Sequence, residues 1–93
     1  MSSPRVDAIE QRLRATFAPL QLTIRDDSQQ HAGHRDPRDG GHFSVYVVSA
    51  AFAGQTLIKR HRAVHDCLAD LMPNEIHALS IKAQTPEELQ QSH

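Results

Sequence analysis

Residues 56–72 read Thr56-Leu57-Ile58-Lys59-Arg60-His61-Arg62-Ala63-Val64-His65-Asp66-Cys67-Leu68-Ala69-Asp70-Leu71-Met72, and this stretch decides the fold. Apolar or histidine side chains recur at steps of four and three, the spacing that keeps residues on one face of an α-helix. This predicted core face consists of Leu57, His61, Val64, Leu68 and Leu71. Thr56 can cap the helix, and Pro73 must end it because proline cannot extend the hydrogen-bond ladder. One helix cannot bury such a face alone, so it needs a sheet.

Two segments before this helix alternate apolar and polar residues, as half-buried strands do. In the first, residues 20–25, the apolar positions are Leu20, Leu22 and Ile24. In the second, residues 42–48, the predicted buried face carries Phe43, Val45 and Val47. Residues 26–41 between them offer almost nothing to bury, and structureless loops longer than about 12–15 residues are usually functional or disordered. We therefore expect an antiparallel strand pair joined by a loop with a functional role.

The remaining segments complete an α+β pattern. Residues 4–17 are predicted to form a first helix whose apolar face carries Val6, Ile9, Leu13 and Phe17. Residues 75–84 alternate as a third strand, with Ile76 on one face and the other face formed by His77, Leu79, Ile81 and Ala83. Thr85 and Glu88 are spaced as a capping box that starts a short last helix. The order helix, strand, strand, turn, helix, strand, helix predicts an α+β sandwich with a three-stranded mixed sheet.

Composition sets the broad class. The 93 residues suit a single domain, with an ordered core expected from about residue 4 to residue 89. One cysteine cannot form an internal disulfide, and a formal charge of -1 gives no global attraction to nucleic acid or anionic membranes. No apolar run approaches the ~20 residues of a membrane span, and the first residues lack the apolar core of a signal peptide. We expect a cytoplasmic protein without membrane contact, in which seven histidines raise the question of metal or proton chemistry.

Short motifs spread along the chain occur in an order and spacing that a known family shares. They are Asp26-Asp27-Ser28, His31-Ala32-Gly33-His34, His42-Phe43, Val47-Val48-Ser49, Phe52-x-Gly54, Arg60-His61-Arg62-x-Val64, Ile76-His77-Ala78-Leu79 and Thr85-Pro86-Glu87. Together they resemble the BolA family from about residue 9 to residue 89. The resemblance implies a class II KH-like fold, which agrees with the predicted element order. The chain lacks the Gly-x-x-Gly loop with which KH domains clamp nucleic acid, so the fold alone does not imply RNA binding.

The resemblance implies a non-enzymatic adaptor in iron–sulfur cluster assembly, trafficking or iron regulation. BolA-like proteins pair with monothiol glutaredoxins around a shared [2Fe-2S] cluster, to which the glutaredoxin supplies a cysteine and bound glutathione. By resemblance the ligands on this side are His77 and His31, with His34 as a substitute for His31. An imidazole is a good iron ligand and makes the ligation sensitive to protonation. The isolated chain is expected to hold no cluster tightly and to be a monomer or a weak homodimer.

The histidine assignments have structural alternatives. His77 would then be a half-buried histidine hydrogen-bonded at the end of the sheet, and His31 a solvated loop residue. The surface expected to face the glutaredoxin includes the loop from Ser28 to Gly41, the start of the third strand and part of the helix from Lys59 onward. A protein-interaction domain without any cofactor remains a further alternative.

The second function that the family resemblance implies is transcriptional regulation of the stress or morphology type through DNA contact. Its candidate residues are the basic cluster Lys59, Arg60 and Arg62 together with Lys82. Positions 59, 60 and 62 spread over more than half of the helix circumference, so they cannot all face one groove. The structural alternative is that Arg60 and Arg62 pair with carboxylates or line a partner surface.

Other residues that could carry chemistry are interpreted as structural. His61 and His65 have a spacing used in zinc sites, but neighbouring arginines would repel a cation, so His61 is expected to be a packed core histidine. Cys67 lies in mid-helix without a second cysteine and is expected to be an inert interior residue. Asp26 and Asp27 are expected to order the loop through side-chain to backbone bonds. No nucleophile triad, carboxylate pair or phosphate-binding loop appears, so no enzymatic activity is predicted.

Overall fold

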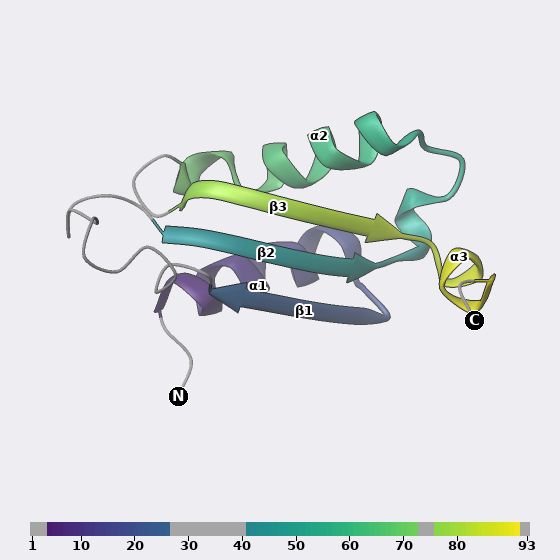
Figure 1. Ribbon diagram of the computed structural model, residues 1–93, viewed down its shortest axis with the longest axis horizontal. Coiled ribbons are helices and arrows are strands. Elements are labelled where there is room, and N and C mark those ends of the chain that lie inside the picture. Colours follow the sequence, from purple (N-terminus) through teal and green to yellow (C-terminus); the bar gives the residue numbers. More distant parts are fainter. Residues whose placement is uncertain (1–3, 27–40, 73–75, 92–93) are drawn as a thin grey trace.

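The computed structural model shows a three-stranded sheet with two helices on one face and a short helix at its end (Figure 1). It describes residues 4–26, 41–72 and 76–91, and the side chain of His77 lies outside this description. The elements are α1 (Pro4–Phe17), β1 (Gln21–Asp26), β2 (Gly41–Val48), η2 (Ala50–Phe52), α2 (Leu57–Cys67), η3 (Ala69–Leu71), β3 (Ile76–Gln84) and α3 (Pro86–Gln91). The predicted α+β order is confirmed. None of the described helices is long and apolar enough to span a membrane.

The sheet is mixed, as predicted, with β2 in its centre. β1 pairs with β2 in antiparallel register, and β2 pairs with β3 in parallel register. The parallel ladder is irregular at its start, because Gly41 pairs with Ile76 while the next residue, His42, pairs with Ala78. His77 is therefore the extra residue of a β-bulge. The predicted metal ligand lies where the regular alternation of β3 is interrupted.

The bulge corrects the predicted faces of the third strand. Simple alternation placed Ile76 on the face opposite Leu79, whereas Ile76 is buried in the core cluster against which Leu79 packs. One inserted residue shifts the side-chain alternation by one position, so Ile76 returns to the core face beside Gly41. For the same reason, alternation assigns no face to His77.

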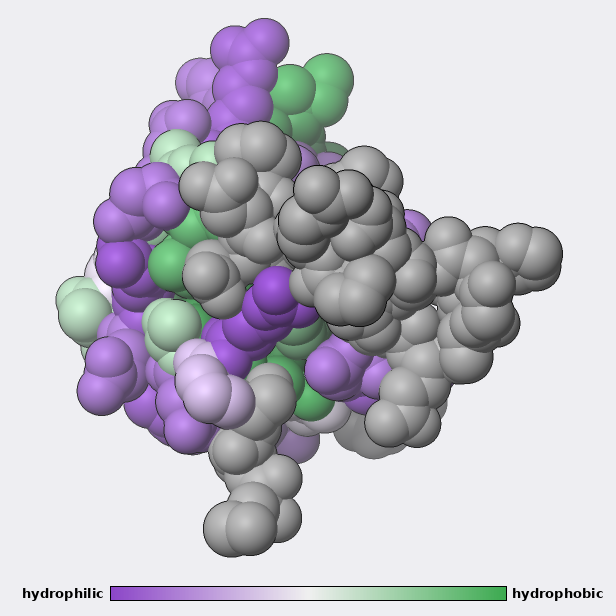
Figure 2. Space-filling model, turned by 90° about the vertical axis from the view of Figure 1, so that its left-hand side faces the viewer, coloured by the Kyte–Doolittle hydropathy of each residue, from purple (hydrophilic) through white to green (hydrophobic). Residues whose placement is uncertain are grey.

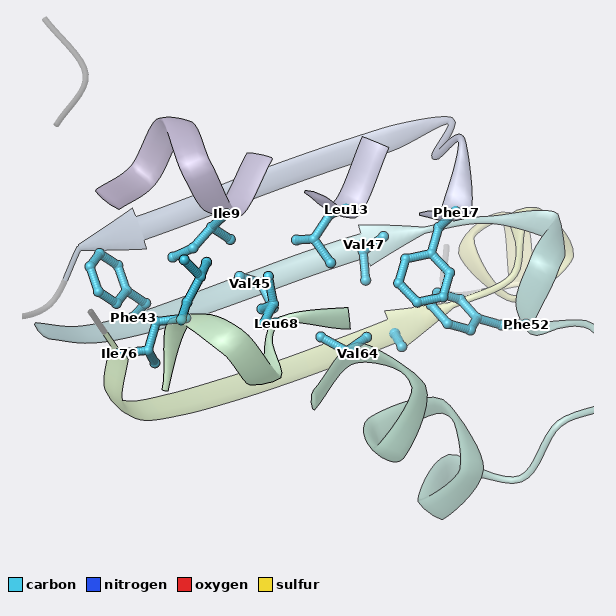
Figure 3. Close-up of a cluster of buried hydrophobic side chains, with 12 residues drawn as sticks. Ile9, Leu13, Phe17, Phe43, Val45, Val47, Phe52, Val64, Leu68 and Ile76 are labelled. Atoms are coloured by element: carbon cyan, nitrogen blue, oxygen red, sulfur yellow. The ribbon is translucent and has the colours of Figure 1, made fainter. Parts of the chain in front are cut away.

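The core lies between the sheet and the two long helices (Figure 3). Ile9, Leu13 and Phe17 point from α1 toward Phe43, Val45 and Val47 of β2, as the periodicity predicted. The centroids of the Phe17 and Phe52 rings lie 4.9 Å apart, and the ring planes are inclined at 38°. This tilted aromatic contact closes the core below η2. The apolar faces of helix and strand thus cover each other.

The start of α2 differs from the prediction. Thr56 caps the helix as expected, since its Oγ1 accepts a hydrogen bond from the Lys59 N–H at 3.2 Å. Val64, Leu68 and Leu71 are buried, but Leu57 is 65% exposed and His61 is exposed. Arg60 takes the core-facing position of the first turn, four residues before Val64. The expectation of a packed core histidine at position 61 is therefore wrong.

Two boundaries were also predicted differently. The long helix ends at Cys67, and a separate 3-10 turn of residues 69–71 follows, so one continuous helix to Met72 is not formed. Leu20 precedes β1 and is 70% exposed, although the alternation placed it on the buried face with Leu22 and Ile24. Ala18 has a positive φ of 44°, and this turn separates Leu20 from the core that Phe17 enters.

Replacement of Leu68 by alanine tests the observed core face of α2. We expect Leu68→Ala to lower the free energy of unfolding by about 2–5 kcal/mol, because it opens a cavity at a fully buried position. Chemical denaturation measures this value. Leu57→Ala is the matched control at the exposed start of the same helix and should change it by less than about 0.5 kcal/mol. Equal losses in the two variants would contradict the observed face.

Candidate functional site

One end of the sheet gathers the start of β3 and both ends of the segment that joins β1 to β2. We call this the histidine end and define it by Asp26, Gly41, His42, Ile76 and the backbone of His77. His31 and His34 lie outside the described residues, as does the side chain of His77. Asp26, the last residue described before His31 and His34, and Gly41, the first described after them, both lie at the end of the sheet where β3 begins.

His42 is a histidine of this end to which sequence reasoning assigned no role. It is half-buried and pairs with Ala78, the residue next to His77. The sequence signal was its place as the first residue of a predicted strand. Only the parallel register, which connects residues 36 positions apart, places it beside the bulge.

Figure 2 looks onto the histidine end. The described side chains visible there are mostly hydrophilic, with hydrophobic residues showing between them. Below this surface, Phe43 and Ile76 are buried at 2% and 1% exposure. The backbone at the bulge therefore rests on a packed core, which holds the start of β3 in place.

The basic cluster predicted for DNA contact is divided by the fold. Arg60 is only 6% exposed and belongs to the interior. Its guanidinium donates two hydrogen bonds to the Glu88 carboxylate, at 2.6 and 3.0 Å. It also donates to the carbonyl oxygens of Ala83 at 3.1 Å and Gln55 at 3.0 Å. The alternative in which Arg60 pairs with a carboxylate is the one observed.

The other three cations lie on two different surfaces. Lys59 and Arg62 are exposed on α2 and, at a spacing of three, are neighbours on the helix surface. The Lys82 ammonium lies over the ring of Tyr46, 5.4 Å from its centroid. Tyr46 and Lys82 belong to the sheet face that α1 and α2 leave uncovered (Figure 1). A single nucleic-acid groove therefore cannot meet all the residues proposed from the sequence.

The Arg60–Glu88 pair fixes α3 to the end of the sheet. Thr85 and Glu88 also form the predicted capping box: the Thr85 N–H donates to Glu88 Oε1 at 2.9 Å, and the Glu88 N–H donates to Thr85 Oγ1 at 3.2 Å. The hydrogen bond from Arg60, followed by the bond from the Thr85 backbone, lowers the pKa of Glu88 from 4.5 to about 2. The same carboxylate raises the pKa of Arg60. No fully buried residue belongs to α3, and we call the Arg60–Glu88 pair that joins it to α2 the polar lock.

A groove of about 540 Å³ lies beside this lock, between the start of α2, the end of β3 and α3. The residues that line it include the paired Arg60 and Glu88 together with Leu57, His61, Lys82, Gln84 and Gln91. The Arg60 and Glu88 side chains already bind each other, so Lys82 is the lysine or arginine of the lining that this pair does not include.

The remaining histidines and the cysteine do not form a metal site in the described part of the chain. His61 and His65 are exposed on α2. The half-buried Cys67 thiol lies 3.2 Å from the Arg12 carbonyl oxygen and 3.2 Å from the Thr16 hydroxyl, which ties α2 to α1. Within residues 4–26, 41–72 and 76–91, no three His, Cys, Asp or Glu side chains gather as metal ligands would.

Comparison with known proteins places this architecture in a family. The family model described as BolA-like protein matches residues 13–88. SufE-like protein 1, chloroplastic/mitochondrial, of Arabidopsis thaliana is 44% identical over 87 residues, which cover 87% of this chain and 24% of that protein. The chain thus spans about a quarter of that relative. The DNA-binding transcriptional regulator BolA of Vibrio cholerae is 42% identical over 85 residues, covering 91% of this chain and 78% of the regulator.

The structural comparison agrees with the sequence comparison. The BolA domain of SufE1 from Arabidopsis thaliana superimposes with a TM-score of 0.83 at 41% identity. The match covers 95% of this chain and 99% of that domain. The mixed sheet and the three helices are therefore the architecture of a solved relative.

Acidification tests the polar lock between Arg60 and Glu88. Because folding lowers the pKa of Glu88 from 4.5 to about 2, the ionised carboxylate stabilises the fold above pH 4.5 and loses this effect as the pH falls toward 2. We expect Glu88→Gln to lower the thermal unfolding midpoint at about pH 7, with a gap to wild type that narrows toward about pH 3. Glu87→Gln, in the same helical turn, is the control and should change the unfolding midpoint little at about pH 7. A pH-independent gap for Glu88→Gln would contradict the lock.

Proposed function

The chain belongs to the BolA-like protein family, and on this basis we propose that it is a non-enzymatic adaptor that pairs with a monothiol glutaredoxin around a bridging [2Fe-2S] cluster. The observation that supports this proposal is the position of His77 on a bulge, at the end of the sheet where Asp26 and Gly41 also lie. We also propose that the fold is of the class II KH-like type, because the element order and the mixed sheet are compatible with it.

The donor set fits one side of a shared cluster. Imidazole nitrogens bind iron well, and two imidazoles on one iron leave the remaining coordination positions to thiolates from elsewhere. In this proposal His77 is held by a strand and His31 or His34 is brought to it by the connecting segment. When bound, the cluster supplies redox-active iron, and the chain contributes ligands and a docking surface.

The distance between the two ends of β3 restricts which residues we propose for contact with the glutaredoxin. Ile76 and Ala83 are seven positions apart in β3, which corresponds to roughly 23 Å at about 3.3 Å per residue. Arg60 contacts the Ala83 carbonyl, so Lys59 and the start of α2 lie at the end of the sheet away from His77. We therefore propose that the glutaredoxin docks on the histidine end and the adjacent η3, and not along the whole of α2.

Loss of one imidazole tests the cluster assignment. We expect His77→Ala to abolish or shift the visible absorption and circular dichroism bands of a heterodimer formed with a monothiol glutaredoxin, glutathione, iron and sulfide, because one iron loses a ligand. His65→Ala removes an exposed histidine of α2 and should leave the spectrum unchanged. Bands of the His77→Ala mixture that equal those of wild type would refute ligation by His77.

A second candidate function is DNA binding, favoured by the similarity to the DNA-binding transcriptional regulator BolA of Vibrio cholerae and by Lys59 and Arg62, which are exposed neighbours on α2. If these residues contact phosphates, Lys59→Ala and Arg62→Ala should each reduce the salt slope of duplex binding by about 0.9. Arg14→Ala, which removes a cation of α1 that pairs with Glu10, is the control that should leave the slope unchanged. Fluorescence anisotropy of a labelled duplex, titrated at several salt concentrations, measures the slope for each variant. Equal slopes in wild type and all variants would contradict this function.

A further inference from the structure

Polar side chains predominate on the sheet face opposite α1 and α2. It faces the viewer in Figure 1, where no described helix crosses it. Paired positions place Thr23, Tyr46 and Lys82 in one row across the strands, and Arg25, Ser44 and Ser80 in the next. These six residues line a shallow groove of about 250 Å³. The face therefore combines an aromatic ring, hydroxyl groups and cations.

The charged residues that the described strands place on this face are all positive. Arg25 and Lys82 are exposed on it, and none of the residues that β1, β2 and β3 direct to this face is acidic. The Asp26 carboxylate at the end of β1 belongs to the alternate row, since Asp26 pairs with Phe43 of the core face. A net positive, flat surface favours an anionic ligand.

Tyr46 adds an aromatic ring to the positive charges of this face. It lies on the central strand and is half-buried, and its hydroxyl donates to Gln84 Oε1 at 2.7 Å, which fixes the ring against the sheet. The Lys82 ammonium lies over one face of this ring, 5.4 Å from its centroid. A flat aromatic ligand could stack on the ring if the flexible lysine moved aside, and the ammonium would then be free to meet a neighbouring anion.

We infer that this face binds single-stranded nucleic acid, with one base stacked on Tyr46 and the adjacent phosphates near Lys82 and Arg25. An aromatic platform flanked by cations on an open sheet accepts splayed bases, because every base offers a flat face to stack. Duplex DNA is a poor fit, since its bases are already stacked on one another. An acidic peptide would satisfy the cations but gains nothing from the ring. This inference is independent of cluster binding at the histidine end.

The sequence provides a direct probe of this surface. The chain has one tyrosine and no tryptophan, so its intrinsic fluorescence comes from Tyr46 alone. Titration of the full chain with short oligothymidylate should quench this emission saturably, with free tyrosine amide as the control for absorption by the oligonucleotide. Anisotropy of a labelled oligonucleotide provides the affinity.

Three variants locate the contact. Tyr46→Ala should weaken binding by about 5- to 150-fold through loss of base stacking. Tyr46→Phe keeps the ring and should bind within about threefold of wild type, which also covers the case in which Tyr46→Ala fails to fold. Lys82→Ala should lower the salt slope by about 0.7, whereas Lys59→Ala on α2 should not change it.

Several outcomes would overturn the inference. They are the absence of saturable quenching, equal quenching by polyglutamate, and stronger binding to the matched duplex than to the single strand. An affinity that falls in Lys59→Ala but not in Lys82→Ala would place nucleic acid on α2 instead.

Discussion

The parallel pairing of β2 with β3 determines how the helices and the open face of this sheet are arranged. A parallel pair cannot be closed by a hairpin, so the chain must cross from the end of β2 back to the start of β3. Here α2 makes that crossing, and burial of Val64 and Leu68 holds it against the sheet. With α1 on the same face, the opposite face stays uncovered, and the starts of β2 and β3 meet at one end. The histidine end and the open face both follow from this one topology.

Local patterns predicted most of the elements, because local chemistry determines them. The capping box at Thr85 and Glu88, the Thr56 cap and the alternation of Phe43, Val45 and Val47 all act over a few residues. Each of these features was found as predicted. The family resemblance, carried by motifs from Asp26 to Glu87, agrees with the family model that covers most of the chain.

The errors arose where distant residues decide the outcome. Arg60 replaced Leu57 and His61 on the core face because Glu88, 28 residues later, neutralises its charge and the Gln55 and Ala83 carbonyls accept its other hydrogen bonds. Helical periodicity alone predicts that an arginine lies on the surface. The carboxylate that offsets the cost of burying its charge lies outside the helical segment over which the periodicity is read. The bulge at His77 is likewise a property of the pairing with β2. The alternation in β3 alone gave no signal of it.

The two ends of the sheet are held by different forces, and this bears on how the molecule responds to pH. At the histidine end, Phe43, Leu71 and Ile76 are buried apolar residues, whose packing does not depend on protonation. At the other end, the charged Arg60–Glu88 pair holds α3. With a pKa of about 2, Glu88 stays ionised throughout the range from pH 5 to 8, in which imidazoles in general change charge. A change of proton concentration in that range therefore leaves the Arg60–Glu88 pair intact, and α3 stays attached to the end of the sheet.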